Sequence, residues 1–319
     1  MPERGATDHA GRPPSPAAPI RTESDRKVSA PVADRQSRPR ATRWSAWHRL
    51  RQNPLALVGS LLALTYVLIG LIGPSLTPYD YAKQDLLAAS LPPFSPGHIL
   101  GTDQVGRDML SRLVVGIRIS LLVGFGVTLI SLVVGTLAGA IAGYYRGWAD
   151  TIISGVIELT WGFPLILIAV ILAGALGPGL LATTLAVGLI NWAGFARIVR
   201  GEILSLREAE YVQAARAVGV GNGRILLRHL LPNVLAPTLV MASYYVALAI
   251  VIEAGLSFIG MGAQPPLPSL GVMIAEGRNY MLQNHWVTTI PGVTIVAAVL
   301  GLNLLGDGLR DILDPRLRQ

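Results

Sequence analysis

The chain has 319 residues, of which 51% are hydrophobic and 14% are charged, and its mean hydropathy is +0.51. Soluble domains carry about 25% charged residues, so this composition excludes an ordinary soluble protein and predicts an all-α membrane protein. The absence of cysteine excludes disulfides, thiolate metal sites, cysteine catalysis and lipidation through cysteine. The 26 basic and 19 acidic residues leave a net charge of +7, which alone would fit a nucleic-acid partner.

Residues 1–43 differ in composition from the rest of the chain. They contain seven prolines and few aromatic or β-branched residues, so they cannot bury enough apolar surface to offset the entropy of ordering. We predict a disordered tail. Residues 1–53 hold eleven Arg or Lys and five Asp or Glu, which leaves a net charge of only +1 for the remaining 266 residues.

Six apolar segments are predicted to cross the membrane. The first, at 55–73, has 19 residues without a charge, which is about the length needed to cross a hydrocarbon core, and it follows an interfacial anchor that contains Trp44 and Trp47. The remaining predicted spans are 119–145, two within 159–196 that are separated by a turn at 174–179, 229–252, and one within 279–306.

Basic residues are divided unequally between the two predicted sides of the membrane. With the N-terminus in the cytoplasm, 21 of the 26 Arg and Lys residues lie inside and five lie outside. Without those of residues 1–53 the division is still ten to five, so the positive-inside rule places both termini in the cytoplasm. The net charge is therefore an asymmetry across a membrane, and no folded basic face remains for a nucleic acid.

The sequence thus predicts a division of the chain into segments with different environments. These are a disordered cytoplasmic tail at 1–43, an anchor and first span at 44–73, an external segment at 74–118, a five-helix core at 119–310 that includes a cytoplasmic loop at 200–232, and a cytoplasmic end at 311–319.

The predicted cytoplasmic loop contains two helical stretches. Residues 202–218 lack proline and glycine, and three nearby glycines are expected to end this helix. Residues 224–231 predict a second short helix that Pro232 stops. Small side chains at Ala214 and Ala215 would let another backbone approach closely, so the pair suits docking into a groove of a soluble partner. The alternative is a solvated connector between spans.

The residues of this loop resemble the EAA loop of ABC-importer permease subunits. Gln213, Ala214 and Ala215, then Gly219, then Leu231–Pro232 follow the spacing of that motif, but Gln213 replaces its glutamate and His229 replaces its isoleucine. The stretch 228–233, Arg-His-Leu-Leu-Pro-Asn, is similar to the form found in peptide importers. The resemblance implies that the loop couples to an ATPase through Tyr211, Gln213, Ala214, Ala215, Gly219, His229, Leu231 and Pro232.

Further segments, between about residue 45 and the end of the chain, resemble the C-type permeases of dipeptide, oligopeptide and nickel importers. They are 100–113, 142–145, 163–164, 253–266 and 306–318, with Leu270 where that family usually has tryptophan. The resemblance implies the type I ABC importer permease fold with six transmembrane helices. It also implies a location in the bacterial plasma (inner) membrane and a role in ATP-driven peptide transport.

The implied partners follow from the same resemblance. They are a second permease subunit in a heterodimer, two ATP-binding subunits or one fused ATPase, an external substrate-binding protein, and a peptide substrate. The chain contains no Walker A sequence, so we expect it to bind no cofactor and to leave ATP and Mg²⁺ to the ATPase subunits. Alternatives are import of nickel or another small solute, and, from other classes, an ion-driven carrier or an intramembrane enzyme.

Three regions with ionisable side chains carry alternative interpretations. Glu158 is either exposed to the transport pathway or reaches the cytoplasmic edge, and Glu253 either faces the pathway or pairs across a subunit interface. Asp103, Arg107 and Asp108 either dock an external protein or form an outer gate, or else they stabilise an extracellular cap through an Asp–Arg pair. The histidines show no metal-binding spacing, so no metal site is predicted.

Overall fold

The computed structural model describes residues 54–313, with side chains described as far as residue 311. The predicted tail at 1–43 and the anchor at 44–53 lie outside this part of the chain, as do residues 314–319. Within 54–313 all the regular secondary structure is helical, and the only β-type contacts are two isolated bridges. This agrees with the predicted all-α class.

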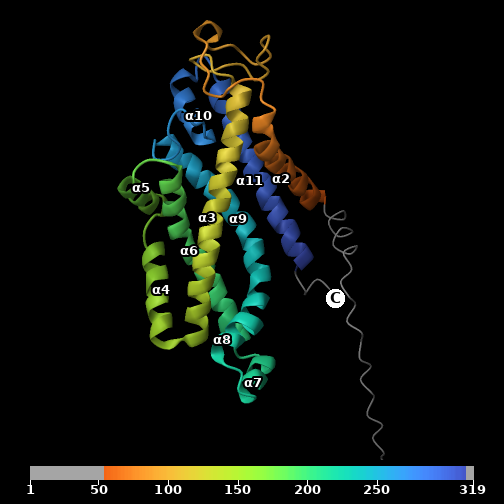
Figure 1. The fold of residues 1–319 in the computed structure, drawn as a ribbon, viewed down its shortest axis with the longest axis vertical. Helices are drawn as coiled ribbons and strands as arrows, with labels where there is room; N and C mark the ends of the chain where they lie inside the picture. Colours follow the sequence, from red (N-terminus) through yellow and green to blue (C-terminus); the bar gives the residue numbers. More distant parts are fainter. Residues whose placement is uncertain (1–53, 314–319) are drawn as a thin grey trace, which may run out of the picture. The chain divides into compact units, whose positions relative to one another are not determined.

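The helices follow one another along the chain as Figure 1 shows. They are α2 (Pro54–Ile72), η2 (Gly73–Ser75), η3 (Leu86–Ala88), α3 (Met109–Tyr145), α4 (Gly147–Trp161), α5 (Leu165–Leu176), α6 (Leu180–Leu206), α7 (Glu210–Ala217), α8 (Asn222–Ile225), η4 (Leu226–Leu230), α9 (Leu231–Phe258), α10 (Leu270–Gly277), η5 (Arg278–Tyr280) and α11 (Trp286–Leu313).

Five helices of the described part are long and apolar enough to cross a membrane: α2, α3, α6, α9 with the turns before it, and α11. A sixth segment consists of α4 and α5, which meet at an angle of 96°. Counted as one span, this pair brings the number to six, the number predicted. The bend falls at Gly162–Pro164, because proline lacks the N–H that a continuous helix needs and disfavours helical backbone at the preceding Phe163.

α3 is the central helix of the bundle, and it packs most extensively against α6. Gly135, Gly139 and Gly143 recur every fourth residue on the side of α3 that meets α6. A Cβ atom added at Gly135 would lie 2.5 Å from the Trp192 carbonyl oxygen, so no larger side chain fits without separating the helices. Small residues therefore set the spacing of α3 and α6, as is common in membrane bundles.

The remaining spans pack around α3 on its other side. α2 lies against α11 and α3, and α9 lies against α3 and α11. Buried apolar side chains join these four helices and α10 in one core that includes Tyr66, Ile117, Ile250 and Leu302. α3 begins at Met109 rather than at Ile119, so this helix continues beyond the charge-free stretch and carries Arg112 and Arg118.

Two expectations for the loop between α6 and α9 are wrong. The helix predicted at 202–218 is interrupted after Leu206 by a turn, and α7 begins at Glu210, which lets Val212 turn back into the core. Pro232 does not stop a helix but lies in the first turn of α9, where the backbone N–H it lacks would have no helical partner. The five-residue π-helical turn η4 joins α8 to α9.

Candidate functional site

The first candidate site is a cap at one end of the bundle, formed by residues 73–108 together with α10 and η5 (Figure 1). Four charged side chains hold it together. Asp103 is fully buried; its Oδ2 accepts hydrogen bonds from Arg107 Nε at 2.6 Å and from the Arg112 guanidinium. Both arginines also donate to Glu276 Oε2 on α10, at 2.8 and 2.7 Å. This network ties the cap loop and α3 to α10.

Asp108 takes no part in that network, although the sequence places it next to Arg107. Its Oδ2 accepts hydrogen bonds from the Ser111 backbone N–H and hydroxyl at 2.8 Å each, so Asp108 caps the N-terminus of α3. Its Oδ1 lies 2.8 Å from His98 Nδ1. The Asp–Arg pair of the cap is thus formed by Asp103 and Arg107.

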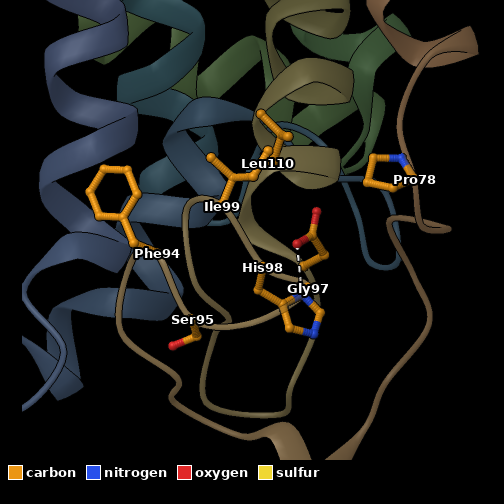
Figure 2. Close-up of a pocket in the computed structure, with 8 residues that line it drawn as sticks. Pro78, Phe94, Ser95, Gly97, His98, Ile99 and Leu110 are labelled. Carbon is orange, nitrogen blue, oxygen red and sulfur yellow. Dashed lines mark hydrogen bonds and ion pairs between the residues drawn. The ribbon is translucent and has the colours of Figure 1, made fainter.

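A cavity of about 390 Å³ opens beside the His98–Asp108 contact. Figure 2 shows this contact as a dashed line on one side, while Phe94 points away from it. Phe94 is 86% exposed, which is unusual for a side chain of its size. The lining residues are Pro78, Phe94, Ser95, Gly97, His98, Ile99, Asp108 and Leu110.

The second candidate site is the loop of α7, α8 and η4 at the opposite end of the bundle (Figure 1). Val212 of α7 is fully buried among the ends of α3, α6 and η4. Spacings of three and four residues place Tyr211, Ala214 and Val218 on another side, where Tyr211 is 44% and Val218 is 79% exposed. α7 therefore presents a small apolar surface while its other side anchors it.

Tyr144 at the end of α3 is the main attachment point of this loop. Its hydroxyl donates to Asn222 Oδ1 at 2.8 Å, and its backbone carbonyl accepts from Arg207 Nη1 at 3.0 Å. The guanidinium of Arg216 lies 5.5 Å from its ring centroid, within the range of a cation–π interaction. One residue thus holds α7, α8 and the turn before α7.

The predicted coupling residues of α7 lie largely on its surface. Gln213 and Ala214 are exposed, and Ala215 is half-buried against the loop core. Gln213 Nε2 donates to the Glu208 carbonyl at 3.0 Å, so this amide already braces the preceding turn. Gly219 has a φ of +81° and no atom near its missing Cβ, so backbone conformation rather than space demands glycine.

The second half of the predicted motif lies at the start of α9. His229 and Leu231 are half-buried and Pro232 is exposed. The structure therefore brings the two halves of the motif into one compact loop around Val212, Ile225 and Leu230, all fully buried.

The two glutamates predicted as pathway or interface candidates lie in different environments. Glu158 is exposed on α4. Glu253 of α9 is fully buried, and its carboxylate accepts hydrogen bonds from Ser257 Oγ at 2.6 Å and Ser120 Oγ at 3.3 Å. Hydroxyl groups of this chain thus satisfy the Glu253 carboxylate, whereas the Glu158 side chain is exposed at the surface of the chain.

The sequence reasoning missed two partners that complete these sites. Glu276 closes the cap network, and Asp150 forms a bidentate ion pair with Arg200 between α4 and α6, at 2.5 and 3.0 Å. Their sequence separations of more than 160 and of 50 residues leave no local signal. Among the described residues, no group of three or more His, Cys, Asp or Glu side chains is placed to hold a metal ion.

Comparison with known families decides what kind of protein contains these two sites. Residues 135–319, more than half of the chain, match the family described as "Binding-protein-dependent transport system inner membrane component". The chain belongs to this family. Residues 42–93 also match the "N-terminal TM domain of oligopeptide transport permease C". The resemblance to C-type peptide permeases is thereby confirmed.

Several curated relatives cover most of the chain. The dipeptide transport system permease protein DppC of Alkalihalophilus pseudofirmus is 41% identical over 273 residues, which is 86% of this chain and 90% of the relative. DppC of Haemophilus influenzae is 39% identical, covering 86% of this chain and 94% of the relative. The oligopeptide transport system permease protein OppC of Bacillus subtilis is 36% identical, covering 92% and 96%.

A solved structure supports the predicted fold. An inward-facing conformation of the MetNI methionine ABC transporter aligns with a TM-score of 0.55 at 21% identity. The alignment covers 64% of this chain and 97% of that chain. The type I ABC importer permease fold is thereby confirmed, and the chain is a multi-pass membrane permease subunit.

Proposed function

We propose that this chain forms half of the translocation pathway of an ATP-driven importer for dipeptides and oligopeptides. The names of its relatives support this substrate class, since they are dipeptide and oligopeptide permeases that match 86% or more of the chain. The single observation that supports ATPase coupling is α7, whose Val212 is anchored in the core while Tyr211 and Val218 remain exposed. This arrangement suits a helix that docks into a groove of a soluble subunit.

The proposed assembly contains a second permease subunit, two ATP-binding subunits or one fused ATPase, and an external substrate-binding protein. The α7 loop and both termini then face the cytoplasm of a bacterial cell, and the cap faces outward, where Asp103, Arg107 and Asp108 support a docking surface or gate. The distribution of basic residues favours this orientation. ATP and Mg²⁺ are bound by the ATPase subunits, and this chain is not catalytic.

The proposed mechanism transmits ATPase closure through the α7 loop, with residues 203–231 acting as a lever. Closure moves α7, and the contacts of Tyr144 with Arg207 and Asn222 pass that movement to α3. Val212 and Ile203 connect the same loop to α6. The spans then alternate between inward-open and outward-open arrangements, and ATP supplies the differential binding energy that such a shift requires.

Substitution of the exposed side of α7 tests this proposal. Val218→Asp places a charge in the apolar contact, and we expect the permease to lose its ATPase subunit on purification and the cell to lose peptide uptake. Leu87→Asp, at a fully exposed leucine of the cap, is the control and should retain the ATPase. Undiminished ATPase association and uptake with Val218→Asp would contradict the proposal.

The substrate class needs a separate measurement, because relatives of one permease family carry different solutes. One curated relative, from Pectobacterium atrosepticum, is a glutathione transport system permease protein with 39% identity. We expect cells that lack this chain to lose uptake of labelled di- to pentapeptides and to keep uptake of nickel. Loss of nickel uptake alone would favour the second candidate, a small-solute importer of the same architecture.

A further inference from the structure

α4 has two sides of opposite chemistry. One is exposed and apolar and suits contact with lipid; its residues are Trp148, Ile152, Val156 and Leu159. The other contains Asp150, Ser154, Glu158 and Trp161, whose spacings of four, four and three residues place them along one side of the helix. We call this second side the polar side of α4. A helix with two such sides does not face lipid all round.

The polar side of α4 faces two arginines of α6. Near its start, Asp150 forms the bidentate ion pair with Arg200. At its end, the Trp161 ring lies 3.9 Å from the Arg197 guanidinium carbon, measured to the ring centroid. Glu158 lies between these two contacts, one turn before Trp161, and is close enough to Arg200 for an electrostatic interaction.

Two of these charges have no counter-ion at hydrogen-bonding distance within residues 54–311. No side chain there donates a hydrogen bond to the Glu158 carboxylate, and no carboxylate there lies within 4.0 Å of the Arg197 guanidinium. Both residues are exposed. Asp150 and Arg200 neutralise each other, whereas Glu158 and Arg197 do not. This difference indicates that Glu158 and Arg197 bind a partner from outside the chain.

The positions of these charges along α4 and α6 limit what that partner is. Glu158 lies eleven residues after the start of α4, which corresponds to about 16 Å along the helix. Arg197 lies nine residues before the end of α6, which corresponds to about 14 Å. Charges without a counter-ion on the helices of a membrane protein face water or another protein rather than lipid.

We propose that Glu158, Trp161 and Arg197 form a subsite of the translocation pathway that binds the two charged ends of a short peptide. The Glu158 carboxylate receives the peptide ammonium group, and the Arg197 guanidinium receives the peptide carboxylate. Trp161, which is half exposed, orients Arg197 and offers a flat apolar surface to peptide side chains of differing shape. The subsite rests on the proposed function, since it requires that peptides pass this chain.

The ligand assignment follows from charge complementarity. A short unblocked peptide carries one positive and one negative end, and the subsite presents one free charge of each sign. A subsite that binds only the two ends of a peptide does not select among peptide sequences. This suits a pathway that accepts many sequences. The guanidinium also matches a carboxylate geometrically, because its N–H groups form paired hydrogen bonds with both oxygens.

The absence of native cysteine makes a direct test possible in the complete importer held in lipid nanodiscs. Gly155→Cys places a thiol one turn before Glu158, at a position where an added Cβ meets no atom within 4 Å. Val156→Cys, which lies on the apolar side of α4 and about 160° around the helix from Glu158, is the control. We expect a charged methanethiosulfonate reagent to modify the Gly155→Cys thiol and not the Val156→Cys thiol, since the reagent needs a hydrated thiolate.

Peptide protection then tests the ligand. Dialanine should slow modification of the Gly155→Cys thiol, whereas N-acetylated dialanine and dialanine amide should each need about tenfold higher concentration or more. In Gly155→Cys combined with Glu158→Gln, the acetylated peptide should protect as well as the free peptide, while the amide still protects less. Arg197→Gln should produce the reverse pattern, and Arg197→Lys should partly restore selectivity for the carboxylate end.

The opposing outcomes are distinct. If the importer transports peptides but the Gly155→Cys thiol does not react, another subunit covers the polar side of α4, and the subsite is overturned while the proposed function stands. The subsite alone is also overturned if dialanine does not slow modification, or if the acetylated and amidated peptides protect as well as dialanine does. An importer that takes up no peptide would overturn the proposed function and the subsite with it.

Discussion

Arg207 and Tyr144 are joined by a hydrogen bond from the Arg207 Nη1 to the Tyr144 backbone carbonyl, at 3.0 Å. The carbonyl belongs to the last turn of α3, where no helical N–H satisfies it. The bond therefore serves two purposes: it completes the hydrogen bonding of the α3 end, and it fixes the turn from which α7 starts.

We predict that Arg207→Ala uncouples the α7 loop without preventing folding. The hydrogen bond is partly exposed, so its loss should cost about 1 kcal/mol of local stability. The expected result is a severalfold lower peptide-stimulated ATPase activity of the assembled importer, with its basal activity unchanged. Arg224→Ala, at an exposed arginine of the same loop, is the control. Equal effects of the two substitutions would show that only the loop's charge matters.

We predict that Gly219→Ala weakens the loop and Gly221→Ala does not. Gly219 has a φ of +81°, where a Cβ costs about 1–2 kcal/mol, while Gly221 has a φ of −64° that alanine adopts freely. Neither position has an atom within 4 Å of an added Cβ, so the pair isolates backbone conformation from space. Limited proteolysis between α7 and α8 should be faster only for Gly219→Ala.

Two glycines of the membrane bundle should respond to alanine with opposite signs. Gly135→Ala forces a methyl group against the Trp192 carbonyl and should cost about 1–3 kcal/mol. Gly201→Ala on α6 meets no atom within 4 Å and should be neutral or stabilising by up to about 1 kcal/mol, since alanine favours helix more than glycine does. Thermal unfolding of the purified importer measures both, and an unchanged midpoint for Gly135→Ala would contradict this account of α3–α6 packing.

The cap network should be sensitive to loss of its buried anion. Asp103→Asn leaves Arg107 and Arg112 with only Glu276 as a counter-charge, and the uncompensated buried charge should cost about 3–5 kcal/mol. We expect a lower thermal midpoint and faster proteolysis of the cap. Asp80→Asn serves as the control, because the exposed Asp80 carboxylate accepts one local hydrogen bond that an amide oxygen can also accept. A normal midpoint for Asp103→Asn would rule out a structural role for the network.

Local patterns in the sequence predicted most of the membrane architecture. Long charge-free stretches identified the spans, and the glycine-rich turn at 174–179 correctly separates α5 from α6. The bend at Pro164 divides an apolar stretch that is continuous in the sequence. Hydropathy could not predict the bend, because it carries no information about backbone direction. The interruption at 207–209 was missed because helix propensity does not register that Val212 must reach the core.

For the candidate sites too, the sequence predicted local features but not contacts between distant residues. The coupling motif was recognisable, since its residues follow one another along the chain. Pairings across the fold were not: Glu276 meets Arg112 from 164 residues away, and Arg197 meets Trp161 only because α4 packs on α6. Those contacts depend on how helices pack together, which neither composition nor spacing encodes directly.

The unbroken length of α3 has a consequence for how the two ends of the molecule communicate. Asp108 caps its first turn beside the cap network, and Tyr144 stands in its last turn beside α7. Its 37 residues span about 55 Å, and neither proline nor a π-turn interrupts them. A tilt of about 5° around its midpoint displaces each end by roughly 2–3 Å in opposite directions. If α3 tilts as a rigid body about its midpoint, a sideways shift of Tyr144 is accompanied by an opposite shift of Asp108.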